Sequence, residues 1–111
     1  MRIPNWEEAV VRRNKITEYL LDSEHPEGAP KAAFFVSFGF TSERPEELIQ
    51  ALRSHAAEND FVSTVEGKFG TKYVVEAPIS CPDERSLMVR SVWIVTENAP
   101  KPRLVTAYGM D

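Results

Sequence analysis

A histidine and a lysine flank a turn-rich loop directly ahead of the most apolar segment of the chain. They are His25 and Lys31 in the stretch "EHPEGAPKAAFF". Histidine can accept or donate a proton near neutral pH, and lysine carries a positive charge that attracts anions. Pro26 restricts the backbone of His25 and Gly28 permits unusual turns, so ordinary loop chemistry is one explanation for this composition. The alternative is that the loop forms a site, with the fold behind it as a rigid mount.

Two further polar residues lie in segments that have the pattern of strands. Arg90, in "LMVRSVWIVT", shares its face of the predicted strand with apolar residues. A guanidinium in that setting needs a partner or an anion, because an unpaired buried charge is costly. Thr106, in "RLVTAY", shares a face with Leu104 and Tyr108. A hydroxyl is therefore expected near Arg90 across the strand pairs.

The first half of the chain must position the loop, and its apolar spacing predicts helices. A short helix is expected near residues 14–22, with Asn14 as a plausible cap. The segment "IPNWEEAVV" before it fits either the start of that helix or a short extended piece. Pro30 suits the first turn of a second helix, which Gly39 ends, and Pro45 opens a third helix.

From residue 61 the apolar pattern changes to a period of two, with β-branched and aromatic residues. The segments "FVSTVEG", "TKYVVEAP", "LMVRSVWIVT" and "RLVTAY" predict strands, and short turn-rich connections join them. Four such strands in succession predict an antiparallel meander. The expected class is α+β, with about three N-terminal helices packed on one face of a C-terminal four-stranded sheet.

Length and composition limit the possible functions. With 111 residues the chain is expected to form a single domain over residues 1–111. It has no apolar stretch long enough to cross a membrane and no secretion signal at its start, so a cytoplasmic location is expected. Cys81 is the only cysteine, which excludes an internal disulfide and a cysteine zinc cage. No P-loop, paired carboxylate motif or glycine-rich nucleotide motif is present, and no cofactor or metal is expected.

Five segments follow one another in a recognisable order: "KITEYLLDSEHPEGAPKAAFF", "GF", "LIQAL", "FGTKYVVEAPISCPDERSLMVRSVWIV" and "PRLVTAY". In this order they resemble a bacterial family whose members occur free-standing and as the C-terminal toxin domain of contact-dependent and other polymorphic toxins. The resemblance covers about residues 15–108. Toxin members often carry a second glycine in the loop, where this chain has Ala29.

Domains of this kind are similar to the metal-independent ribonucleases that include barnase, EndoU, the tRNase colicins and the RelE-like toxins. The resemblance implies an endoribonuclease that cleaves RNA through attack by its 2′-hydroxyl, without a cofactor. The partners that it implies are tRNA or another structured RNA, and a cognate antitoxin or immunity protein.

The resemblance also implies which residues carry the reaction, because His25, Lys31, Arg90 and Thr106 stand at the family's recurring polar positions. RNA cleavage needs a base, an acid and cations around the phosphate. His25 would be base or acid, and Lys31 and Arg90 would hold the phosphate with backbone N–H groups at the start of the Pro30 helix. Thr106 would donate a hydrogen bond.

Each of these residues also has a structural interpretation. His25 can simply form a hydrogen-bonded turn, Lys31 can be a solvated residue that pairs with Glu27, and Thr106 can be a strand former. Arg90 can form a structural ion pair with Glu66 or Glu76, on neighbouring strands. In a third interpretation, the four residues staple the loop to the sheet.

Three other residues are expected to be structural. His55 in the third helix is interpreted as a surface residue, and Trp6 and Trp93 as core or rim aromatics.

A noncatalytic protein-binding module, or a degenerate member of the fold, is the competing function. The formal net charge of −4 favours it, because RNA-binding proteins are usually basic. The sequence does not specify the oligomeric state.

Overall fold

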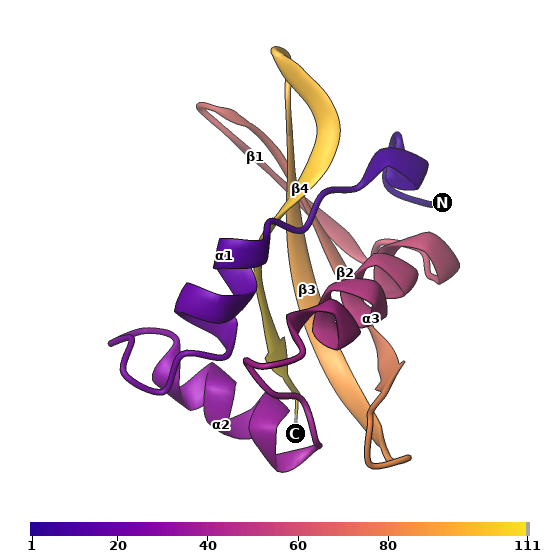
Figure 1. The fold of residues 1–111 in the computed structure, drawn as a ribbon. Coiled ribbons are helices and arrows are strands. Elements are labelled where there is room, and N and C mark those ends of the chain that lie inside the picture. The colour runs from indigo at the N-terminus through magenta and orange to yellow at the C-terminus, as the bar shows by residue number, and fades with distance from the viewer. Residues whose placement is uncertain (111) are drawn as a thin grey trace.

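The computed structural model describes residues 1–110, and Figure 1 shows a helical N-terminal half that leads into an antiparallel sheet. The predicted α+β class, with N-terminal helices ahead of a four-stranded antiparallel sheet, is confirmed. In chain order the elements are η1 (Trp6–Glu8), α1 (Arg13–Lys15), η2 (Ile16–Leu20), α2 (Ala29–Ser37), α3 (Pro45–Glu58), β1 (Ser63–Gly67), β2 (Gly70–Ser80), β3 (Ser86–Thr96) and β4 (Ala99–Gly109).

The helix that was expected near residues 14–22 is built differently from the expectation. It begins at Arg13 with Arg12 as N-cap and no side-chain cap, so the expected cap at Asn14 is wrong, and Asn14 lies inside the helix. α1 then passes directly into η2, a π-helical turn in which the Leu21 N–H donates to the Ile16 carbonyl at 2.8 Å. Such five-residue turns are rare and occur often at functional sites.

The segment before α1 is extended near Val10. The Val10 N–H donates to the Pro102 carbonyl at 2.8 Å, and the Leu104 N–H donates to the Val10 carbonyl at 3.0 Å. Val10 thereby forms a parallel bridge with Arg103 of β4. Of the two interpretations of this segment, the extended one is correct at Val10.

Helices α2 and α3 begin where the sequence predicts, and α2 also ends where it predicts. Pro30 and Pro45 lie in their first turns, where a missing N–H costs nothing. α2 ends in a turn with Gly39 at a φ of 101°, and the Phe40 N–H donates back to the Phe35 carbonyl at 3.1 Å. That closing hydrogen bond is typical of a glycine-terminated helix.

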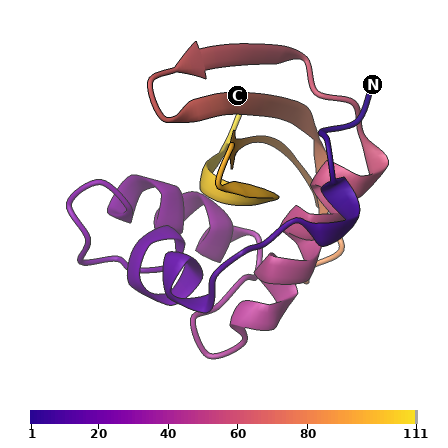
Figure 2. The ribbon, with the colours of Figure 1, turned by 90° about the horizontal axis from the view of Figure 1, so that it is seen from above.

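The sheet is a meander in the order β1-β2-β3-β4, with each strand antiparallel to the next. Figure 2 shows the helices gathered on one side of it. That face carries the core, in which Trp93 of β3 is fully buried and Trp6 is partly buried at the rim, as predicted. Other buried residues of the core are Ile16, Leu20, Phe35, Phe40, Leu48, Leu52, Val75, Ile79, Val89 and Ala107.

Strand β4 contains one extra residue, at Val105. Val92 pairs with Thr106, whereas the next residue along β3, Trp93, pairs with Leu104. A bulge of this kind changes the face on which the following side chains lie. The expectation that Leu104 shares a face with Thr106 is therefore wrong: Leu104 lies in the core and is 5% exposed, and Thr106 is half-buried.

His55 is a core residue, so its interpretation as a surface residue is wrong. Its side chain is 2% exposed and joins α3 to two strands of the sheet. The ring nitrogens lie 2.8 Å from the Ser91 Oγ and 2.8 Å from the Ala77 carbonyl. The Trp93 Nε1–H also donates to Ser91. Because these partners satisfy the ring, α3 can bury a polar residue on its inner face.

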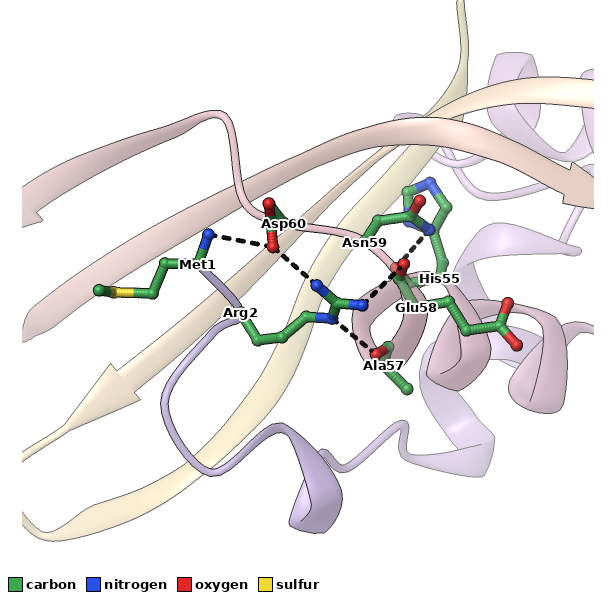
Figure 3. Close-up of polar contacts among 7 residues, drawn as sticks. All are labelled: Met1, Arg2, His55, Ala57, Glu58, Asn59 and Asp60. Atoms are coloured by element: carbon green, nitrogen blue, oxygen red, sulfur yellow. Dashed lines mark hydrogen bonds and ion pairs between the residues drawn. The ribbon is translucent and has the colours of Figure 1, made fainter.

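The N-terminus is fastened to the end of α3, as Figure 3 shows. The Arg2 guanidinium donates to the carbonyls of Ala57 at 2.9 Å and Glu58 at 3.2 Å. It also forms an ion pair of 2.7 Å with Asp60, which the amino group of Met1 contacts at 3.0 Å. Carbonyls at a helix C-terminus lack partners within the helix, and a cation there is favourable. None of the helices within residues 1–110 has the length and apolar character to cross a membrane.

Candidate functional site

A hydrogen-bonded chain of three side chains joins η2, α2 and β4. The Lys31 amine donates to the Tyr19 hydroxyl, which lies 3.1 Å from the Thr106 Oγ1. The three residues are half-buried, so the group remains in contact with solvent. We call Lys31, Tyr19 and Thr106 the tyrosine cluster. It brings together two of the four residues that the sequence singled out.

The backbone around Tyr19 depends on a close approach by Gly28. A Cβ atom at Gly28 would lie 2.1 Å from the Tyr19 carbonyl oxygen and 3.1 Å from its ring. No side chain fits in that space. The loop before α2 can therefore press against η2 only with glycine at this position, and that contact sets the distance between Tyr19 and Lys31.

Positive charge surrounds the Tyr19 ring. The Lys31 amine lies 4.8 Å from the ring centroid and the Lys15 amine 5.3 Å from it. Partial burial raises the pKa of the Tyr19 phenol, but hydrogen bonds with Lys31 and Thr106 and the charges of both lysines outweigh that effect. The net result is a pKa below the ordinary value for tyrosine, because every one of these contacts stabilises the phenolate.

His25 packs on the cluster but has its own task in the loop. Its ring lies edge-on to the Tyr19 ring, with 5.0 Å between centroids. The Nδ1 atom accepts hydrogen bonds from the backbone N–H groups of Glu27 at 3.0 Å and Gly28 at 2.9 Å. These bonds place the ring proton on Nε2. The structure thus contains the hydrogen-bonded turn that was one of the two interpretations of His25.

The guanidinium of Arg90 is bound by two neighbouring side chains, Glu76 and Tyr108. Its Nε donates to Glu76 at 2.6 Å, and another guanidinium nitrogen forms an ion pair with the same carboxylate at 2.5 Å. Its third nitrogen donates to the Tyr108 hydroxyl at 2.9 Å. The expected hydroxyl near Arg90 is therefore Tyr108, and the expected ion pair is with Glu76.

The register connects Arg90 to the cluster. Arg90 is paired with Tyr108, and Thr106 lies two residues away from Tyr108 on the same strand. Side chains two residues apart on a strand point to the same face. Glu76, Arg90, Tyr108 and Thr106 therefore lie on one face of the sheet, and Thr106 contacts the Tyr19 hydroxyl.

Two expectations about the loop are not met in the described part of the chain. No carboxylate, that of Glu27 included, lies within ion-pair distance of the Lys31 amine in residues 1–110. The N–H groups of Gly28 and Ala29 at the start of α2 already donate to His25, and Pro30 has none. Most of the N–H groups expected to hold a phosphate are thus occupied.

Tyr19 is the functional candidate that the sequence interpretation missed. Its position in "ITEYLL" fits the apolar helical spacing, and a tyrosine at such a position is usually a core residue. The sequence could have indicated Tyr19 only through its contact with Lys31. That contact depends on how η2 packs against α2, which the spacing of apolar residues does not reveal.

A hollow at the other end of the sheet's turns lies away from the cluster. It has a volume of about 690 Å³ and lies between the β1–β2 and β3–β4 turns, lined by Lys68, Phe69 and Asn98 among others. Within residues 1–110, no three His, Cys, Asp or Glu side chains are grouped so that they could hold a metal ion.

Comparisons with known proteins agree with the fold. The sequence model of the family described as "Domain of unknown function (DUF6883)" matches residues 2–111. No curated protein matches the sequence. A solved chain of the "Contact-dependent growth inhibition toxin - immunity protein complex from Klebsiella pneumoniae 342" superimposes with a TM-score of 0.73 over 96% of this chain and 97% of that chain. Their sequences are 14% identical, so this likeness is one of fold.

Proposed function

We propose that this chain, which belongs to the DUF6883 family, is a toxin-related endoribonuclease that cleaves RNA without a metal ion. The observation that carries the proposal is the tyrosine cluster, in which the Lys31 amine donates to a Tyr19 hydroxyl that also contacts Thr106. A phenol with a lowered pKa, held by a cation at the surface, is suited to proton transfer.

In the proposed reaction, Tyr19 is the general acid. The 2′-oxygen of the RNA attacks phosphorus and its proton passes to water, while the bond from phosphorus to the 5′-oxygen breaks. The Tyr19 phenol gives its proton to the departing 5′-oxygen, which leaves as a hydroxyl. The products are a 2′,3′-cyclic phosphate and a 5′-hydroxyl end. Lys31 and Thr106 stabilise the phenolate, which solvent then protonates.

His25 and Arg90 have positioning roles in this proposal. His25 uses its Nδ1 lone pair within the loop, so it holds Gly28 and the Tyr19 ring in place. The Arg90 guanidinium is bound by Glu76 and Tyr108, so it orients the strand that presents Thr106.

The biological setting follows from the likeness of fold and is also a proposal. The similar solved chain comes from a complex of a toxin with an immunity protein. We extend this setting to the present chain and propose that a cognate inhibitory protein binds it and that its RNA substrate is encountered in the cytoplasm.

The test is cleavage of a mixed RNA pool by the purified chain in the presence of EDTA. The wild-type chain should yield 2′,3′-cyclic phosphate ends. Tyr19→Phe removes the acid and should lower the rate by about 10²–10⁴-fold, the usual contribution of a positioned acid or base. Lys31→Met should also lower the rate.

Tyr73→Phe is the matched control, because Tyr73 packs against Phe61 on the buried face of the sheet. It should cleave at the wild-type rate. If folded wild-type protein cuts no RNA, or if Tyr19→Phe cuts as fast as Tyr73→Phe, the proposed function is wrong.

A noncatalytic protein-binding module is the second candidate, and two observations favour it. The net charge is −4, and Val62, Val65 and Phe69 around β1 and its turn are more than half exposed. Exposed apolar side chains of this kind are frequent in protein interfaces. Inactive wild-type protein that nevertheless captures a partner through Phe69, with capture lost in Phe69→Ser, would establish this function instead.

A further inference from the structure

A second group of cations lies beside the tyrosine cluster, around a hollow of about 240 Å³. Arg12, Lys15 and Arg103 line it, and Val10 and Ile94 form its apolar wall. We call it the basic hollow. It exists because the extended segment at Val10 runs along β4 at the position where the β4 bulge interrupts regular pairing.

The three cations of the basic hollow have no counter-charge in the described chain. None of them lies within ion-pair distance of a carboxylate in residues 1–110. Among side chains of the same residues, the Nε of Arg103 is the one buried polar atom without a hydrogen-bond partner. Buried polar groups are nearly always satisfied, and one that lacks a partner calls for an explanation. Arg103 itself lines the hollow, so an anion bound there supplies the missing charge.

Four other arginines of the chain differ from Arg12 and Arg103, because each of them forms an ion pair. Each of the following is neutralised by a neighbouring carboxylate: Arg2 by Asp60, Arg13 by Glu46, Arg85 by Asp83 and Arg90 by Glu76. A chain with 17 acidic and 13 basic residues has acids to spare. Unpaired cations such as Arg44 and Arg53 also occur elsewhere in residues 1–110, so the distinctive feature is that three of them line one hollow.

Lys15 makes the basic hollow continuous with the tyrosine cluster. It lines the hollow, and its amine lies 5.3 Å from the centroid of the Tyr19 ring. A strand whose scissile phosphate lies at Tyr19 would therefore pass Lys15 before it reaches Arg12 and Arg103.

We propose that the basic hollow binds a backbone phosphate of the RNA strand that flanks the cleaved bond. This proposal rests on the proposed function of the tyrosine cluster. Arginine presents several N–H donors in a planar fork that fits phosphate oxygens, and the apolar wall suits the sugar face of a nucleotide. A protein with a negative net charge can thus bind RNA through a small positively charged part of its surface.

Binding is measured with a short fluorescent RNA that carries 2′-fluoro sugars, because it lacks the 2′-hydroxyl and cannot be cleaved. Arg12→Gln and Arg103→Gln should weaken binding about three- to tenfold and reduce the slope of log K against log salt by about 0.7 for each lost contact. Arg13→Gln is the matched control: it removes the same charge from the next position, but Arg13 is bound to Glu46. It should bind as the wild type does.

A second readout separates this proposal from the proposed function. A dinucleotide has one phosphate and cannot reach both places, so Arg12→Gln and Arg103→Gln should cleave it at the wild-type rate, whereas Tyr19→Phe should not. If wild-type protein cleaves nothing, the proposed function fails, but the binding results still decide the role of the hollow.

Three results would overturn the proposal. They are unchanged RNA binding by Arg12→Gln, an equal loss in Arg13→Gln, and displacement of the RNA by polyglutamate as readily as by unlabelled RNA. Arg12 is exposed and has no side-chain partner in residues 1–110, so its substitution leaves the fold intact even if Arg103→Gln does not.

Discussion

At the scale of single residues, the proposed chemistry depends on one hydroxyl between an amine and a second hydroxyl. Lys31 donates to Tyr19, and Thr106 completes the chain. Lysine is suited to this place because its ammonium both donates the hydrogen bond and stabilises the phenolate. The acid therefore depends on Lys31 as much as on Tyr19 itself.

His25 is half-buried, whereas His55 is buried in the core. The burial of His55 leads to a prediction about how stability depends on pH. Burial lowers the pKa of His55, and hydrogen bonds with backbone carbonyls only partly oppose this effect. The unfolded chain consequently binds a proton more readily than the folded chain does. The contribution of His55 to the free energy of unfolding should be constant above about pH 6.5 and should fall as the pH drops below it, by at most about 1.4 kcal/mol per pH unit. Urea denaturation at several pH values measures this slope.

Substitution of His55 provides the control. His55→Gln should remove the slope and lower the free energy of unfolding by about 1–3 kcal/mol, since Ser91 and the Ala77 carbonyl lose their partner. A slope that persists in His55→Gln would show that another group is responsible.

At the scale of elements, the site depends on the contact between the loop before α2 and the π turn of η2. Gly28→Ala would place a methyl group 2.1 Å from the Tyr19 carbonyl oxygen. The two elements must separate to relieve that clash, which should lower the free energy of unfolding by about 1–3 kcal/mol. The same movement lengthens the distance from Lys31 to Tyr19, so RNA cleavage should be lost at temperatures where the variant is still folded.

Gly67→Ala is the matched control for this substitution. A methyl group there would meet only the Gly70 carbonyl oxygen, at 3.6 Å, which is an ordinary contact. It should leave both stability and cleavage close to the wild-type values. Equal effects of the two substitutions, measured by urea denaturation and RNA cleavage, would contradict the role given to Gly28.

The elements themselves follow closely from local sequence signals. Proline in the first turns of α2 and α3, Gly39 after α2 and the alternation in β2 and β3 specify where these elements lie. The bulge at Val105 was not predictable, because "RLVTAY" alternates without interruption and only the pairing with β3 reveals the extra residue. The same holds for His55, whose burial depends on Ser91 and Ala77 in distant strands.

At the scale of the whole molecule, the net charge of −4 gives a misleading impression of the surface. Several arginines are neutralised by neighbouring acids, and some of the cations without a carboxylate partner, Lys15, Lys31 and Arg103 among them, lie around Tyr19 and the basic hollow. A local positive area of this kind can attract a phosphate even when the total charge is negative. That residues 1–111 form a single domain stays a prediction.

The candidate site was predictable in part. Residue type and position in the sequence pointed to His25, Lys31 and Thr106, and the fold places all three around one tyrosine. Tyr19 was missed because its role depends on contacts with Lys31 and Thr106, which belong to other elements of the chain. The polar partners of Arg90 could be predicted from the sequence, because a meander fixes which strands are neighbours and alternation fixes which side chains share a face.

The most direct test of the central claim, that Lys31 makes Tyr19 an effective acid, is the pH dependence of RNA cleavage in EDTA. An acid must be protonated, so the wild-type rate should fall on the alkaline side with a midpoint below about 10, the ordinary pKa of tyrosine. Lys31→Gln should move that midpoint to higher pH and lower the rate, because the phenolate loses its cation. An alkaline midpoint that is the same in wild type and Lys31→Gln would contradict the claim.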